Sequence, residues 1–325
     1  MHGLERSVGT DRNDSRRPPG GHLETAAASL PDGAAAKGDP RKVPVSVIVP
    51  VKNEVHNLAR CLASLGWADE VFVVDSQSSD DTVRIAEESA AKVVQFHFNG
   101  TYPKKKNWAL ENLPFANEWV LIVDADEVIS PELAEEIAAT LAAPAHDGYY
   151  LNFRYMFLGR WIKHCGYYPV RVLRLFKHRL GRYEKMPVVA SANTGDNEAH
   201  EHVILQGSTG RLRHEVLHYP YPTIESWVDK HNRYSNWEAA LYDRFLKGDA
   251  DDARLPFSHR WKRLAKRVYL RLPFRGVIRF FYAYVIRRGF LDGRAGFTLC
   301  VLLSFYDFLS AAKVYEQRLK GRDNE

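Results

Sequence analysis

The feature that most constrains this chain is a fourfold alternation of apolar, β-branched runs with helical segments. Each apolar run ends at polar or turn-forming residues, as buried strands do. The runs occupy 45–50, 70–75, 92–98 and 118–127. The segments between them carry apolar residues at helical spacing or helix-capping residues. This alternation predicts an α/β fold with a mostly parallel sheet and helices on both of its faces.

Polar side chains follow three of these predicted strands. Ligands of open α/β sheets bind at the carboxyl ends of the strands, so these side chains are expected to share one edge. They are Asn53 and Glu54, Asp75, and Asp124 and Asp126.

The most informative of these groups is Asp124-Ala125-Asp126-Glu127. Two carboxylates one residue apart point the same way on an extended backbone, where they repel each other. Mg²⁺ or Mn²⁺, which prefer carboxylate oxygen, would relieve that repulsion. The alternative is an acidic segment that precedes a helix capped by Ser130.

Asp75 is followed by small hydroxyl residues and then by a helix start. A carboxylate at that place can accept hydrogen bonds from ribose hydroxyls or from a base, and we expect Asp75 to contact a ligand. Ser79 and Asp80 are interpreted as helix caps.

The first and third predicted strands lead into further polar segments. Pro50, Asn53 and Glu54 could contact a base or a ribose, or they could form an ordinary strand–helix turn. A lysine of the run 104–106 can offset the charge of a diphosphate. Three consecutive lysines also form ordinary solvated faces, so at most one of them is expected to be functional.

In combination, these segments resemble glycosyltransferase family 2. The resemblance is carried by "VSVIVPVKNE", "LGWADEVFVVDSQSSDDT", "YPKKKNWAL" and "WVLIVDADE". Within the family, the chain is similar to the bacterial branch that adds sugars to the lipopolysaccharide core, often described as β-1,4-glucosyltransferases. The similarity extends from Val45 to about Arg318. It implies a GT-A fold, a nucleotide-sugar donor that is usually UDP-linked, and inversion at the anomeric carbon.

The resemblance also implies roles for individual residues. Lys106 matches a donor-site lysine, and Asp124 and Asp126 match the DxD pair, the first nearer the ribose and the second on the metal. The family often has Gln where this chain has Lys105, a departure that could change donor affinity or only surface charge. The base and ribose are placed near Pro50, Asn53, Glu54 and Asp75.

Inverting transfer needs a carboxylate that takes the proton of the acceptor hydroxyl. Glu201 lies between His200 and His202, and similar transferases carry a His-Glu pair in this region, so Glu201 is our candidate for the catalytic base. A solvated turn is the alternative, and Glu198 and Glu184 are the other candidates.

His218 matches a recurrent histidine of this branch and could complete a metal site with Asp126, or it could be a hydrogen-bonded core residue. His214, four residues earlier, would suit a zinc site on a helix, but the surrounding pattern predicts a strand and argues against zinc. Arg171 and Arg174 alternate with apolar residues. They could hold a phosphate or be solvated strand-edge residues.

The composition divides the chain into three regions. Residues 1–42 have no aromatic side chain and are predicted to be disordered. Residues 43–250 are predicted to form the catalytic domain, in which extended aromatic segments follow Gly148 and a helix follows about Thr223. Residues 251–325 are predicted to form a helical basic-aromatic region.

Residues 254–290 combine many Lys, Arg and aromatic residues with no acidic one. This composition is typical of an amphipathic helix in an anionic membrane interface. A helix that packs on the catalytic domain is the alternative, and nucleic acid is rejected because no nucleic-acid fold signature is present. No run of about 18 uncharged apolar residues exists, so a spanning helix is not expected. The closest run, 295–312, contains Asp307.

Net charge and cysteine content exclude further classes. A formal charge of +5 and a pI near 8.9 are too mildly basic to imply nucleic acid. Three cysteines, Cys61, Cys165 and Cys300, are odd in number and far apart in the sequence. They form neither a disulfide framework nor a paired metal motif, which predicts core thiols in a reducing compartment.

Together with these observations, the resemblance implies an inverting transferase that needs Mg²⁺ or Mn²⁺. It would move a sugar from a UDP-linked donor to a lipid-linked or lipopolysaccharide-core saccharide, at the cytoplasmic face of a bacterial inner membrane. Two alternatives stay open. A polyprenyl-phosphate sugar synthase needs no base because its acceptor is already anionic. A non-catalytic nucleotide-sugar or membrane-binding module is the other, and Asp124, Asp126 and Lys106 argue against it.

Overall fold

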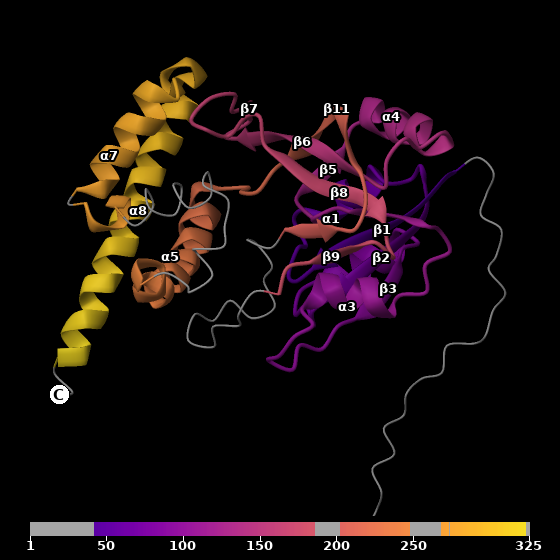
Figure 1. Cartoon of the computed structure of the whole chain (residues 1–325), viewed down its shortest axis with the longest axis horizontal. Coiled ribbons are helices and arrows are strands. Elements are labelled where there is room, and N and C mark those ends of the chain that lie inside the picture. Colours follow the sequence, from indigo (N-terminus) through magenta and orange to yellow (C-terminus); the bar gives the residue numbers. More distant parts are fainter. Residues whose placement is uncertain (1–41, 186–201, 248–267, 273, 323–325) are drawn as a thin grey trace, which may run out of the picture. The chain divides into compact units, whose positions relative to one another are not determined.

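The parallel half of the central sheet contains the first four strands of the chain. The structure is a computed structural model that describes residues 42–185, 202–247, 268–272 and 274–322, all within the compact unit Lys37–Glu325 (Figure 1). These strands lie in the order β3-β2-β1-β4 and all run parallel. Their bounds are β1 Val43–Val51, β2 Ala68–Asp75, β3 Lys92–Gln95 and β4 Trp119–Ile122. The predicted alternation is confirmed, although the third and fourth strands are shorter than expected.

Helices cover both faces of this half. Val47 and Val49 of β1 pack in one core cluster with side chains of α1, α2 and α4, whereas Ile48 packs in a second cluster with Ala109 and Leu110 of α3. Successive side chains of a strand point to opposite faces, so the two clusters lie on opposite sides of the sheet. The helices are α1 Leu58–Ala63, α2 Thr82–Glu88, α3 Lys105–Asn112 and α4 Pro131–Ala142.

The other half of the sheet is mixed. From β4 the order continues β8-β6-β11-β5, in which β8 is antiparallel to both neighbours, β11 is parallel to β6, and β5 is antiparallel to β11. The strand β7, Arg160–Trp161, extends β6, and the strands β9 and β10 form a separate pair. The remaining bounds are β5 Glu127–Ile129, β6 Gly148–Phe157, β8 Arg171–Lys177, β9 Gly181–Tyr183, β10 Val203–Leu205 and β11 Thr209–His218.

The C-terminal region is helical, as expected. A third hydrophobic cluster joins Phe157 of β6 and Trp227 of α5 to Leu299 of α8, so α5 and α8 pack against the end of a sheet strand. The elements are α5 Ile224–Lys247, α7 Arg275–Phe281, the π-helical turn η3 Tyr282–Ile286, the 3₁₀ turn η4 Gly289–Asp292, and α8 Gly293–Arg322.

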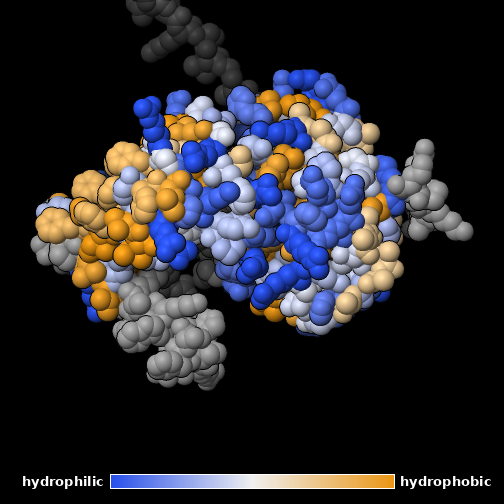
Figure 2. All heavy atoms as spheres, turned by 90° about the horizontal axis from the view of Figure 1, so that it is seen from above, coloured by the Kyte–Doolittle hydropathy of each residue, from blue (hydrophilic) through white to orange (hydrophobic). Residues whose placement is uncertain are grey.

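The surface of α7, η3 and α8 is strongly apolar. Figure 2 shows orange side chains gathered over these helices. Exposed apolar residues of these helices include Phe281 (58% exposed), Ile286 (69%) and Phe308 (62%). Among the described residues, one segment, Gly289–Lys320, is long and apolar enough to cross a membrane by length and composition, since it contains an 18-residue window with a mean hydropathy of 1.6. No spanning helix was expected from the sequence because Asp307 interrupts the apolar run of this segment.

All three cysteines are buried and free, as predicted. The sequence did not indicate that two of them are neighbours: the Sγ atoms of Cys165 and Cys300 lie 3.5 Å apart. A Cβ added to Gly289 would lie 2.8 Å from each sulfur and 2.9 Å from the carbonyl oxygen of Ala283. The backbone of η4 therefore approaches this cysteine pair as closely as only glycine permits.

Candidate active site

The ends of β1 and β2 form one hydrogen-bonded network. Val51 pairs with Asp75, whose buried carboxylate accepts hydrogen bonds from the amide (3.0 Å) and the hydroxyl (2.5 Å) of Ser78. The Ser78 oxygen accepts the Asn53 amide at 2.8 Å, and Asn53 Oδ1 accepts the Ser79 amide at 2.8 Å. The structure therefore brings Asn53 and Asp75 to one edge of the sheet, as the strand order predicted.

Pro50 and Glu54 flank this network. Pro50 lies in β1 opposite Val74. The Glu54 carboxylate accepts a hydrogen bond from Asn57 Nδ2 at 2.9 Å. Burial raises the pKa of Glu54, and the nearby Asp126 carboxylate raises it further. The carboxylate of Glu54, in the loop after β1, is thus within electrostatic reach of the acidic residues after β4.

The N-cap of the helix that follows Asp75 differs from the prediction of Ser79 or Asp80. Asp81 holds the N-cap position of α2, but its side chain makes no capping bond. Asp80 Oδ1 accepts the Thr82 amide at 3.1 Å, and Asp80 Oδ2 accepts the Val55 amide at 3.3 Å. Asp80, one residue before the N-cap, therefore bonds the amide of the first helical residue and ties the helix to the loop after β1.

The acidic segment after β4 is a turn, which corrects the prediction of one extended strand over 118–127. β4 ends at Ile122 and β5 begins at Glu127. The Glu127 amide donates to the Asp124 carbonyl at 2.9 Å, and the Asp124 amide donates to the Glu127 carboxylate at 2.8 Å. These two bonds close the turn, so Asp124 and Asp126 contact different partners.

Asp124 is held by two cations. Arg174 Nη2 donates to Asp124 Oδ2 at 2.6 Å, and Lys106 Nζ lies 3.0 Å from Asp124 Oδ1. Burial alone would raise the pKa of Asp124, but the guanidinium and the ammonium outweigh it and lower that pKa well below its ordinary value. Asp124 therefore remains ionised.

Arg174 is a buried member of this cluster, although the sequence left it open as a phosphate ligand or a solvated strand-edge residue. Its Nη2 also donates to Glu127 Oε1 at 2.9 Å. Within the described part of the chain, its Nε and Nη1 atoms have no hydrogen-bond partner. Arg171, on the same strand, is exposed.

The lysine run is buried, so the interpretation as a solvated face is wrong. Lys104, Lys105 and Lys106 are each at most 8% exposed, because α3 packs against the strand ends. Lys105 Nζ donates to the carbonyl oxygen of Val51 at 2.8 Å. The residue that departs from the family's Gln is thus an internal link to β1, not a surface charge.

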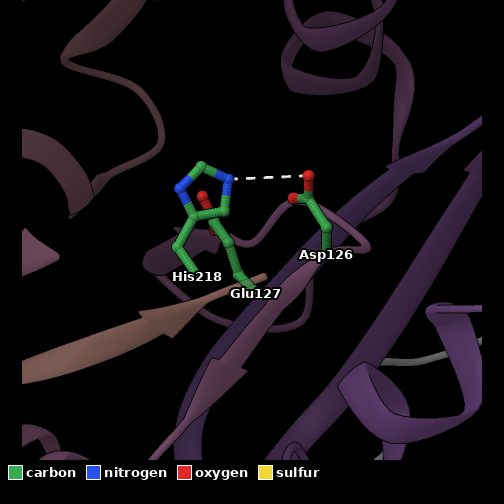
Figure 3. Close-up of side chains that lie close together, drawn as sticks. All are labelled: Asp126, Glu127 and His218. Atoms are coloured by element: carbon green, nitrogen blue, oxygen red, sulfur yellow. Dashed lines mark ion pairs between the residues drawn. The ribbon is translucent and has the colours of Figure 1, made fainter. Parts of the chain in front are cut away.

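The second acidic group contains Asp126, Glu127 and His218 (Figure 3). The Nε2 atom of His218 faces Asp126 Oδ2 at 3.5 Å, and one ligand atom from each of the three residues lies within 4.8 Å of the others. β11 pairs with β5 so that His218 lies opposite Glu127. Strand register therefore positions the histidine.

The electrostatics of this group favour a cation. Burial raises the pKa of Glu127 to about 7, and Asp124 adds to the effect while Arg174 opposes it. Burial would lower the pKa of His218, but Asp126 outweighs it and raises that pKa. Two carboxylates and an imidazole suit Mg²⁺ or Mn²⁺, with remaining positions open to phosphate oxygens. Glu127 was not singled out in the sequence, although it is the last residue of the DADE quartet.

The other predicted residues are placed only in part. Glu201, with Glu198, lies outside the described residues. Glu184 Oε2 lies 3.9 Å from His202 Nδ1, and both side chains are exposed. His214 Nδ1 lies 2.9 Å from a carboxylate oxygen of Glu136 on α4, and His214 lies in the strand β11, as the surrounding pattern predicted.

A sheet of this order, with an acidic turn after its fourth strand, is the architecture expected of a GT-A glycosyltransferase. The sequence pattern described as Glycosyl transferase family 2 matches residues 46–196. An uncharacterised glycosyltransferase of Rickettsia conorii is 34% identical over 286 residues, which cover 86% of this chain and 92% of that protein. The chain therefore belongs to glycosyltransferase family 2 and has the predicted α/β fold of that class.

Two further relatives were found. The lipopolysaccharide core biosynthesis glycosyltransferase LpsC of Rhizobium meliloti is 27% identical over 297 residues, which cover 87% of this chain and 96% of that protein. The crystal structure of Staphylococcus aureus TarS residues 1–349 in complex with UDP-GlcNAc aligns at 16% identity with a TM-score of 0.42, covering 87% of this chain and 93% of that one.

Proposed function

We propose that this glycosyltransferase is inverting and needs a divalent cation, Mg²⁺ or Mn²⁺. Its donor is a UDP-linked sugar and its acceptor a lipid-linked or lipopolysaccharide-core saccharide. The observation that carries the proposal is the cluster of Asp126, Glu127 and His218 beside Asp124 and Lys106. The similarity to LpsC supports a lipopolysaccharide-core acceptor.

In this proposal the donor binds along the edge formed by β1, β2 and β4. Asn53 and Asp75, which are linked through Ser78, lie where a base and ribose would bind, and Pro50 and Glu54 flank them. Asp126, Glu127 and His218 would hold the cation, which supplies positive charge to the departing diphosphate. The Lys106 ammonium stabilises the same developing charge.

The acceptor hydroxyl needs a base, and Glu201 remains our candidate. The reaction is a single displacement in which Glu201 takes the hydroxyl proton as the oxygen attacks the anomeric carbon. A Glu201→Gln enzyme with full activity would favour the polyprenyl-phosphate sugar synthase alternative, because an anionic phosphate acceptor needs no deprotonation.

Asp126→Ala tests the cation site. It should lower sugar transfer and donor hydrolysis by orders of magnitude, with little change in melting temperature. Glu118→Ala is the matched control because it removes an exposed carboxylate next to the other end of β4. Release of UDP from UDP-sugars would be measured with and without Mn²⁺. Near-normal turnover by Asp126→Ala would reject the assignment.

We also propose that the apolar surface of η3, η4 and α8 binds the anionic inner face of a bacterial inner membrane. Exposed Ile286 and Phe290 alternate there with exposed Arg287, Arg288 and Arg294, a mixture that fits acidic headgroups above an apolar layer. This location would bring the site to a lipid-linked acceptor.

Vesicle flotation tests the membrane proposal. The wild-type chain should float with vesicles that contain phosphatidylglycerol and less with purely zwitterionic vesicles. Ile286→Asp should weaken flotation, whereas Ile204→Asp, on the exposed face of β10, should leave it unchanged. Equal flotation of the two variants would exclude this surface as the contact.

A further inference from the structure

Lys230 of α5 lies at the candidate active site but belongs to neither of its two clusters. Its Nζ is 3.8 Å from Asp126 Oδ2 and 5.3 Å from the centre of the Tyr221 ring. Its side chain is 32% exposed, so a ligand can reach it. Within the residues that the structure describes, this ammonium makes no hydrogen bond, although it has three donors to offer.

The helix holds Lys230 firmly in place. The next residue, His231, stacks on Trp227 with ring centres 3.5 Å apart, and its Nδ1 lies 2.9 Å from the Trp227 carbonyl oxygen. Trp227 is fully buried in the cluster that includes Leu299 of α8. The buried side of α5 thus fixes the backbone from which Lys230 extends towards Asp126.

Lys230 stands beside two of the loops that form the donor edge. Asp126 lies in the turn after β4, and Glu54 lies in the loop after β1. The ammonium of Lys230 therefore lies within the electrostatic field of carboxylates from both loops.

The two aspartates of the turn differ in how fully they are neutralised. Asp124 has close contacts at 2.6 Å and 3.0 Å from Arg174 and Lys106. Among the described residues, the ion pairs of Asp126 are only the longer ones, at 3.5 Å from His218 and 3.8 Å from Lys230. Asp126 can therefore still bind a cation, and Lys230 can still bind an anionic group of the same ligand.

We propose that Lys230 binds the diphosphate of the nucleotide-sugar donor, as a second ammonium alongside Lys106. Lys230 lies outside the segment 46–196 that matches the family pattern, so the C-terminal half of the chain completes the donor site. This inference rests on the proposed donor. Lys230 contacts the departing group and stabilises the negative charge that develops on it.

The test compares Lys230→Met with Lys230→Arg and with Arg233→Met. Arg233 is exposed on the same helix, so its replacement removes the same charge away from the site. Binding of UDP, GDP and uridine to the full chain would be measured by calorimetry in the presence of Mn²⁺. Melting temperatures would be recorded in parallel.

We expect Lys230→Met to weaken UDP binding about tenfold or more, the usual loss for one charge-assisted hydrogen bond. Uridine binding should not change, Lys230→Arg should recover part of the affinity, and Arg233→Met should behave as wild type. If Lys230→Met lowers the melting temperature but keeps the wild-type preference for UDP over uridine, Lys230 is only structural and the inference fails. If the wild type binds neither UDP nor GDP, the proposed function fails with it.

Discussion

Replacement of Arg174 by Met would expose the energetics of the acidic turn. Within the described residues, the guanidinium is the only cation that forms an ion pair with Glu127 and one of two that do so with Asp124. Met fills a similar volume without charge. The variant therefore leaves the Glu127 carboxyl buried beside Asp124 and leaves Asp124 with Lys106.

Both carboxyl groups contribute to the loss of unfolding free energy in this variant. Glu127 has a pKa of about 7 in the folded protein, above the unfolded value of 4.5. It therefore destabilises the folded state by an amount that grows as the pH rises from 4.5 to 7 and is constant above pH 7. Without Arg174 the pKa of Glu127 rises further, so the destabilisation continues to grow between pH 7 and pH 8. Over this one pH unit the additional loss of unfolding free energy is about 1.4 kcal/mol. Asp124 loses a charged hydrogen bond worth about 1.5–3 kcal/mol, reduced because it is one-third exposed and keeps Lys106.

We therefore expect Arg174→Met to lose about 2–4 kcal/mol of unfolding free energy at pH 8. The loss should be about 1.4 kcal/mol smaller at pH 6, where Glu127 is protonated in both proteins. Urea unfolding in EDTA at the two pH values measures this difference. Glu127→Gln in the Arg174→Met background should remove the pH-dependent part. An equal loss at pH 6 and pH 8 would refute this account of the buried carboxyl.

Two other outcomes can be checked with purified protein. Because Mn²⁺ must displace a proton from Glu127 and from His218, whose pKa is also raised, its affinity should rise about tenfold or more between pH 6 and pH 8 in calorimetry. Glu127→Gln should bind more weakly with a shallower pH dependence, and a flat wild-type profile would contradict the proposed ligands. Gly289→Ala should cost about 1–3 kcal/mol of stability, because the added methyl group would meet the sulfurs of Cys165 and Cys300. An unchanged melting temperature would show that η4 moves aside.

The parts of the fold that depend on neighbouring residues were predictable. The β-branched run of β1 and the Ser130-Pro131 start of α4 each carry their signal within a few residues, and both elements form as expected; Ser130 Oγ accepts the Leu133 amide. The grouping of Asn53 and Asp75 followed from strand order alone.

The parts that depend on distant residues were not predictable. In the sequence, Arg174 alternates with apolar residues, which indicates only that it lies in a strand. The pairing of β8 with β4 is what brings it beside Asp124. The lysine run carries a surface-like composition, yet α3 buries it against the end of β1. The pairing of Cys165 with Cys300 depends on how α8 packs, which no sequence spacing reveals.

The antiparallel ladder between β5 and β11 determines which changes of chain length the site tolerates. Val216, Leu217 and His218 pair with Ile129, Val128 and Glu127, so backbone hydrogen bonds alone set the height of the imidazole above the acidic turn. Changes of length in the loops between these two strands would leave that register untouched as long as β6 and β8 keep their places in the sheet. A slip of the ladder by a single residue would instead send the histidine to the opposite face and silence the site.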